Sequence, residues 1–220
     1  MKKITLVLIF VTLVVLLSLT ACVPGIAPYW GGGGMMGGGM MGGSYGGQYN
    51  PNTKPITLDQ ATEAVSRYLS TYGQNLVLTE VMEFAQNFYA EVEEKDTGIH
   101  AMELLIDRST ARVYPEMGPN MMWNTKYGQM TRMMGNQYGR SQPTTNMTVS
   151  PEQAKKLAQA WLDINLRGVT VAEADTFYGY YTLHTLKDGQ ITGMLSVNGA
   201  NGAIWYHTWH GSFIDMKELD

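Results

Sequence analysis

Cysteine is nearly absent from this chain, because its 220 residues include only one, Cys22. A single cysteine excludes both a disulfide within the chain and a metal cluster held by several thiolates. Charged residues are also scarce, at 15%, and the net charge is −4 at pH 7. Apart from Lys2 and Lys3 at the start, no run of basic residues occurs. The chain therefore lacks the clustered Lys and Arg that binding to nucleic acid requires.

Catalytic signatures are missing as well. The HExxH and CxxC motifs do not occur, and no pair of carboxylates has a spacing that indicates general acid–base chemistry. Two glycine patterns, Gly42-x-Ser44-x-Gly46 and Gly32-x-Gly34-x-x-Gly37, match a nucleophile elbow and a dinucleotide fingerprint by letter only. Each needs a strand before it and a helix after it, and neither is predicted there. The sequence predicts a protein that is not an enzyme.

The first segment has the parts of a secretory signal peptide. Lys2 and Lys3 precede the apolar stretch 4–19, and small residues follow it. The ending Leu19-Thr20-Ala21-Cys22 resembles the lipobox of bacterial lipoproteins. That resemblance implies cleavage before Cys22 and a diacylglyceryl group on its sulfur. The alternative is an uncleaved membrane helix, because the apolar stretch approaches the ~20 residues that span a bilayer.

Either alternative places the rest of the chain on the extracytoplasmic side of a bacterial membrane. With two or three acyl chains, Cys22 would anchor the protein stably. The stretch that follows contains glycine runs interleaved with Met35, Met36, Met40 and Met41. No core can form from this composition, so it predicts a flexible tether. We place the signal peptide at residues 1–21 and the tether at 22–55.

Two later segments predict helices with matching starts. Thr57 and Ser150 are hydroxyl N-caps, and each is followed by a glutamine, Gln60 or Gln153, at the third helical position. This is a capping-box arrangement. Apolar residues then recur at helical spacing in both segments. Gly73 and Gly168 are the expected stops.

Strand patterns follow each predicted helix. Apolar and polar residues alternate over 84–93 and again over 177–184, and turn signals come next at 96–98 and 188–189. We expect an α+β fold of two repeated units, 56–116 and 149–220, joined by a linker at 117–148. Each unit would pack one helix on a small antiparallel sheet of about three strands. Whether the two sheets join is left open by the sequence.

The ends of these units resemble a known family. The stretches 106–113 and 197–204 read IDRSTARV and VNGANGAI. Each predicts the end of a strand, a turn that begins with Asp or Asn, and the start of a final strand. This pattern is similar to the PepSY domain, although Ala111 stands where that family usually has glycine. The resemblance implies a small α+β fold without catalytic residues. It also implies a binding or inhibitory role toward a protein partner, such as a protease of the thermolysin type or another envelope protein.

The predicted linker is rich in methionine, and thioether sulfur is a soft ligand that selects Cu(I) over Zn, Mg or Ca. A binding or buffering site for Cu(I) is therefore the alternative function. Methionines in glycine-rich loops also form pliable apolar surfaces without any metal. The candidate ligands are Met117, Met121, Met122, Met130, Met133 and Met134.

The histidines and acidic residues give weaker signals. His207 and His210 lie three apart, so in a strand they point to opposite faces and chelate poorly unless the strand ends between them. We expect them to be partly exposed residues at a sheet edge, and we assign no role to His100 and His184. Glu91 shares a strand face with Glu93, which we expect to be solvated. That face is alternatively a contact surface for a basic partner.

Overall fold

The computed structural model describes residues 54–129 and 144–219. These belong to one unit that spans Ser44–Asp220. The predicted signal peptide with Cys22, nearly all of the tether, and Met130, Met133 and Met134 lie outside the described residues. Among the residues that are described, no helix combines the length and the apolarity needed to cross a membrane.

The two predicted helices are present, and their starts are explained by local hydrogen bonds. Helix α1 spans Leu58–Leu69 and helix α4 spans Pro151–Asn165, each with a complete capping box at Thr57 or Ser150. The hydroxyl accepts from the backbone of the third residue, and the glutamine side chain accepts from the backbone of the cap. A third, short helix, α2, covers Pro119–Met122.

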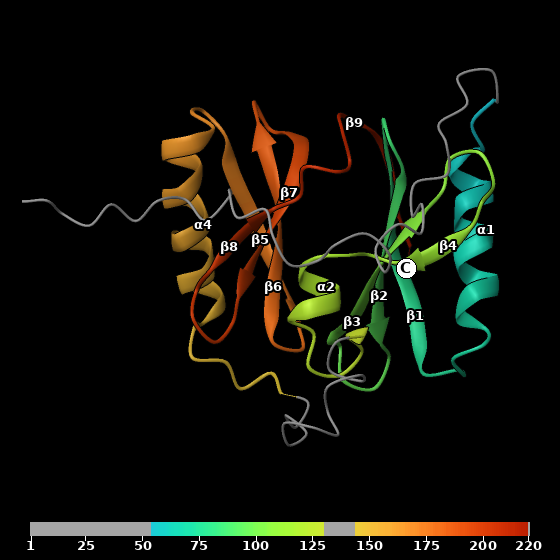
Figure 1. The fold of residues 1–220 in the computed structure, drawn as a ribbon, viewed down its shortest axis with the longest axis horizontal. Coiled ribbons are helices and arrows are strands. Elements are labelled where there is room, and N and C mark those ends of the chain that lie inside the picture. Colours follow the sequence, from blue (N-terminus) through green and yellow to red (C-terminus); the bar gives the residue numbers. More distant parts are fainter. Residues whose placement is uncertain (1–53, 130–143, 220) are drawn as a thin grey trace, which may run out of the picture. The chain divides into compact units, whose positions relative to one another are not determined.

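One mixed sheet of nine strands contains both halves of the described chain. Its first half holds β1 (Leu76–Phe84), β2 (Phe88–Glu94), β3 (His100–Ile106) and β4 (Val113–Pro115). Its second half holds β5 (Thr170–Phe177), β6 (Tyr180–Lys187), β7 (Gln190–Asn198) and β8 (Ile204–Tyr206). The last strand, β9 (Phe213–Glu218), returns to pair with β1. The strand order is β8-β7-β6-β5-β3-β2-β1-β9, with β4 paired to β3 (Figure 1).

The α+β class is confirmed, whereas the number and limits of the strands differ from the prediction. The alternation over 84–93 is interrupted by a turn at 85–87, so Phe84 ends β1 and Phe88 begins β2. A second turn at Tyr178 and Gly179 separates β5 from β6 in the same way. Strand β9 was not predicted. The two halves meet in a parallel pairing of His100 with Phe177, so the sheet is continuous.

Helices α1 and α4 cover one face of the sheet and build two apolar cores (Figure 1). Helix α1 packs Ala61, Val65 and Leu69 on β1, β2 and β3. Helix α4 packs Ala154, Ala158 and Leu162 on β5, β6, β7 and β8. Burial of these side chains supplies the main favourable free energy of folding.

The turns predicted from the sequence are present at the ends of hairpins. Asp188 and Gly189 have φ of 52° and 79°, the left-handed pair that a two-residue hairpin needs. Ala111, before β4, has φ of 58°, and Gly202, before β8, has φ of 73°. An L residue other than Asn or Asp is strained in this conformation, whereas glycine, which has no Cβ, is not. Ala111 therefore occupies a position that suits glycine.

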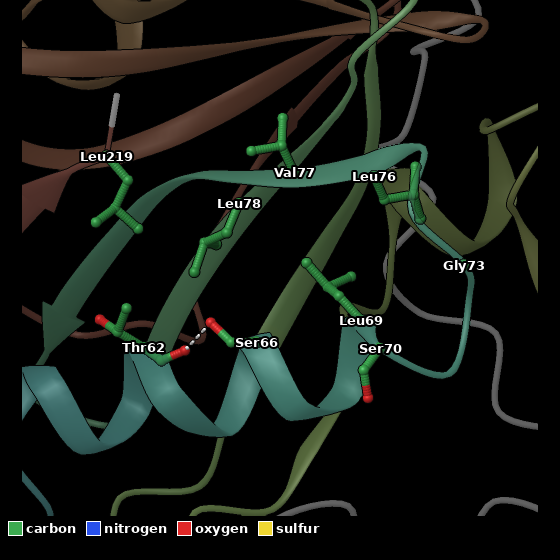
Figure 2. Close-up of a pocket in the computed structure, with 9 residues that line it drawn as sticks. All are labelled: Thr62, Ser66, Leu69, Ser70, Gly73, Leu76, Val77, Leu78 and Leu219. Atoms are coloured by element: carbon green, nitrogen blue, oxygen red, sulfur yellow. Dashed lines mark hydrogen bonds between the residues drawn. The ribbon is translucent and has the colours of Figure 1, made fainter.

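A hollow of about 390 Å³ lies beside α1. Leucines of α1 and β1 line it together with Leu219, while Thr62 and Ser66 contribute only hydroxyl groups (Figure 2). None of the side chains lining this hollow is ionisable. It therefore offers shape, apolar surface and hydroxyl groups but no ionisable side chain.

Candidate functional site

The sheet face opposite the helices carries the polar chemistry of the molecule. Residues that alternate with the core of β2 and β3 point to this face, and they meet side chains of the second half there. Tyr180 Oη and Thr182 Oγ1 each lie 2.8 Å from a carboxylate oxygen of Glu103. All three of these residues are fully buried. The two halves thus share a buried polar layer, whose acidic and imidazole members are Glu80, Glu91, Glu94, Glu103, Glu116, Asp175, His100, His184, His207 and His210.

At one end of this layer, Glu116, His207 and His210 come together. Glu116 follows β4, His207 follows β8, and His210 lies in the turn before β9. Glu116 Oε1 is 3.5 Å from His207 Nδ1 and 3.0 Å from His210 Nε2. The side chains of Glu116 and His207 have no exposed surface, and that of His210 is 1% exposed. We call these residues the Glu116 triad.

The expectation of exposed, poorly paired histidines at 207 and 210 was wrong. Strand β8 ends at Tyr206, so the two residues lie in a turn and not in an extended chain. Gly211, with φ of 77°, continues that turn. The loop is held on the first half because the backbone amides of Ala85 and Gln86 donate to the carbonyls of Ser212 and His210.

Aromatic rings close the surroundings of the Glu116 triad. Trp209 stacks on His207 with ring centroids 4.7 Å apart, and Phe84 stacks on His210 at 4.6 Å. The indole nitrogen of Trp209 donates to Glu116 Oε1 at 2.8 Å. Gly118 permits this approach, because a Cβ there would lie 3.2 Å from the Trp209 ring. The triad therefore lies in a closed, mostly aromatic environment.

Protonation of the Glu116 triad follows from this environment. Burial alone would raise the pKa of Glu116, but the neighbouring His207 and His210 hold it well below its usual range. Burial lowers the pKa of His210, because a charged ring is poorly solvated there.

A second group of charges lies near the junction of the two halves. His100 Nδ1 is 3.0 Å from Glu91 Oε2, and His184 Nε2 is 3.4 Å from Glu80 Oε1. Burial would lower the pKa of both rings, but their carboxylate partners raise it to about 9. Burial and the neighbouring Glu91 raise the pKa of Asp175 to about 7. Both imidazoles are therefore positively charged at neutral pH.

The expectation of a solvated face for Glu91 was also wrong, because this residue is 2% exposed. The face on which it lies is covered by the second half of the sheet and not by water. His100 and His184, to which the sequence gave no role, are the cations that accompany these carboxylates.

Glu94 and Glu103 differ in charge although both are buried. Burial would raise the pKa of Glu94, but hydrogen bonds from Lys126, Tyr127 and Tyr178 lower it to about 2. Burial, with Glu116 nearby, raises the pKa of Glu103 well above its usual range. Glu94 is therefore an anion at neutral pH, whereas burial favours the protonated form of Glu103.

The methionines proposed as Cu(I) ligands are not placed in this layer. Met117 and Met122 are 44% and 49% exposed, and Met121 is half-buried. The other three candidates lie outside the described residues. The thioether site stays a prediction. Sequence reasoning missed the Glu116 triad, for which the only signal was His-x-x-His among aromatic residues at the end of a strand.

Comparison with protein-family models gives no match, and no curated protein matches the chain. Two solved structures are similar. The first is the Bacillus megaterium YpeB C-terminal domain, with 10% identity and a TM-score of 0.25 over 69% of this chain and 62% of that chain. The second is a candidate lipoprotein from Clostridium difficile 630, with 15% identity and a TM-score of 0.23 over 76% of this chain and 97% of that chain. Both likenesses are too weak to assign a family.

Proposed function

We propose that this protein is a non-enzymatic binding module that is anchored by lipid on the extracytoplasmic side of a bacterial membrane. The observation that carries the binding role is the closure of the Glu116 triad, whose side chains are at most 1% exposed. A catalytic centre has to admit a substrate and keeps an open position, whereas a closed site suits a small resident ligand. The described hollow beside α1 offers no ionisable group for catalysis either.

The location rests on the lipobox-like ending at Cys22. Expression of the full chain in a bacterium fed radiolabelled palmitate tests it, with a Cys22→Ala variant in parallel. We expect label and membrane association in the wild type and neither in the variant. Equal labelling of both proteins, or none in either, would remove the lipid anchor from this proposal.

The PepSY resemblance supports a protein partner, and a protease of the thermolysin type is the first one to test. Full-length protein in detergent should slow peptide cleavage by such a protease in a dose-dependent manner. An unchanged cleavage rate at saturating protein would end the protease-regulating form of the proposal. The resemblance also supports an origin of the units 56–116 and 149–220 by duplication.

Cu(I) binding is a second candidate, favoured by the exposed thioethers of Met117 and Met122. A titration with Cu(I) against a chromogenic chelator tests it. Competition that disappears when all six candidate methionines are replaced by leucine would support the candidate. Competition that survives these replacements would place the copper elsewhere.

A further inference from the structure

Three buried atoms of the Glu116 triad have no hydrogen-bond partner. They are Glu116 Oε2, His207 Nδ1 and His210 Nε2. One ligand atom from each residue can be chosen so that all three lie within 4.8 Å of one another. Leaving a buried polar atom unsatisfied costs about 1–3 kcal/mol. Three such atoms in one cluster, two of them within 3.5 Å of the other oxygen of Glu116, therefore indicate a shared ligand.

The proton of His210 can be located from its neighbours. Its Nδ1 lies 2.8 Å from Asn87 Oδ1, and the amide nitrogen of Asn87 donates to the Trp209 carbonyl at 3.0 Å. That second bond fixes the orientation of the amide, so the oxygen faces the ring. An amide oxygen can only accept, which requires Nδ1 to carry the proton. The other nitrogen, Nε2, lies 3.0 Å from Glu116 Oε1 without a hydrogen bond and is the atom left to bind a ligand.

The tautomer of His207 follows from a longer chain of bonds. Thr182 donates to Glu103, and its oxygen lies 3.0 Å from Ser196 Oγ. The hydroxyl of Ser196 therefore donates to Thr182, and its oxygen is left to accept from His207 Nε2 at 2.9 Å. The proton of His207 is thus on Nε2. Its Nδ1 lies 3.5 Å from Glu116 Oε1 without a hydrogen bond.

Two imidazole nitrogens and a carboxylate thus converge in a closed site without hydrogen bonds for the three unpaired atoms. A cation between them would be coordinated by all three residues. Two neutral imidazoles with one carboxylate suit Zn²⁺, Fe²⁺, Ni²⁺ or Cu²⁺, whereas Mg²⁺ and Ca²⁺ prefer oxygen ligands alone. The outer bonds to Asn87, Ser196 and Trp209 are of the kind that orient metal ligands.

We propose that Glu116, His207 and His210 bind one divalent transition-metal ion of the Zn²⁺ class. The inference rests on the proposed binding function and names the ligand of that closed site. Because the three residues follow β4, follow β8 and precede β9, the ion would hold the C-terminal strand against the first half of the fold. The ion would therefore have a structural role.

The test uses the full-length protein purified in detergent and stripped with a chelator. Zn²⁺ is titrated by calorimetry, and the metal content of gel-filtered protein is measured by mass spectrometry. We expect one equivalent of Zn²⁺ per chain, and ligand-field bands in the visible spectrum when Co²⁺ is used. The variants Glu116→Gln and His210→Gln should each bind at least ~100-fold more weakly, since each removes a ligand outright.

The matched control is Glu94→Gln, which removes a buried carboxylate away from the triad and should bind Zn²⁺ as the wild type does. Circular dichroism of the stripped proteins shows whether each variant is folded. If a glutamine variant unfolds, the Co²⁺ spectrum of the wild type still decides, because bands without imidazole coordination contradict the proposal. Failure of the wild type to take up Zn²⁺ or Co²⁺, or undiminished binding by the folded triad variants, overturns it. Palmitate labelling at Cys22 is independent of this result, so loss of the metal site leaves the anchored module standing.

Discussion

His210 Nε2 lies 3.0 Å from Glu116 Oε1 although the opposite nitrogen of the ring already faces Asn87 Oδ1 at 2.8 Å. With a proton on the side of Asn87, the opposite ring nitrogen faces a carboxylate oxygen in a buried space without a hydrogen bond. The contact is therefore better explained by a bridging cation than by a hydrogen bond. Substitutions of the residues around the triad test this explanation.

Ser196→Ala should weaken metal binding without removing a ligand. Its hydroxyl accepts from His207 Nε2 and so fixes the tautomer that leaves Nδ1 free. Loss of such an outer bond typically lowers affinity by about 10–100-fold. Calorimetry with Zn²⁺ measures the change. Ser66→Ala, on the exposed face of α1, is the control and should leave affinity unchanged. Equal affinities of all three proteins would contradict the assigned tautomer.

Glu103→Gln and Glu94→Gln should differ in cost, although both residues are at most 1% exposed. Burial raises the pKa of Glu103 and so favours its protonated form, which an amide should replace with a loss of about 1 kcal/mol or less. Glu94→Gln removes a buried carboxylate from its ion pair with Lys126, whose side chain is 34% exposed, and should cost about 2 kcal/mol. Urea unfolding at pH 7 measures both free energies. Equal costs would mean that the two carboxyl groups carry the same charge.

The fall in the free energy of unfolding at acid pH should depend on Glu94. Its pKa is about 2 in the folded protein, against ~4.3 when unfolded. The stability that it contributes is fully present above the unfolded value and is lost as pH falls through the folded value. Urea unfolding between pH 5 and pH 2 should therefore show a shallower fall for Glu94→Gln than for the wild type. Parallel curves would argue against an anionic Glu94.

These differences mark what the sequence could predict. The capping boxes at Thr57 and Ser150 and the turn at Asp188 and Gly189 depend on neighbours within a few residues, so their pattern was enough. The burial of Glu91 depends on which surface covers its strand face, and a two-residue period identifies a face without identifying its cover.

The Glu116 triad could not be predicted for a related reason. The distance from Glu116 to His210 depends on where β8 ends and on the return of β9 to β1. Trp209, which donates to Glu116, lies 93 residues away along the chain. Local pattern rules do not reach over such separations. The turn that interrupts residues 84–93 was missed because neither glycine nor proline marks it at positions 85–87.

Stability at alkaline pH should depend on His184. The pKa of this ring is raised to about 9, against ~6.5 when unfolded, chiefly because Glu80 opposes the effect of burial. Its contribution is fully present below pH ~6.5 and is lost as pH rises through 9, on the order of 3 kcal/mol in all. His184→Gln should flatten the fall in unfolding free energy over this window. Lys187→Gln, an exposed change on the same strand, is the control. Identical slopes for His184→Gln and wild type would show that His184 gains no proton on folding.

Ala111→Gly should stabilise the protein, because Ala111 has φ of 58°. A left-handed conformation costs an L residue roughly 1–2 kcal/mol, and glycine avoids that strain while losing more backbone entropy on folding. The net gain should be about 1 kcal/mol in the free energy of unfolding by urea. Ala203→Gly, outside the left-handed region, should instead lower the stability. A loss of stability in Ala111→Gly would mean that the turn before β4 is not left-handed in solution. A gain confined to Ala111→Gly would show that alanine is kept there against a local preference for glycine.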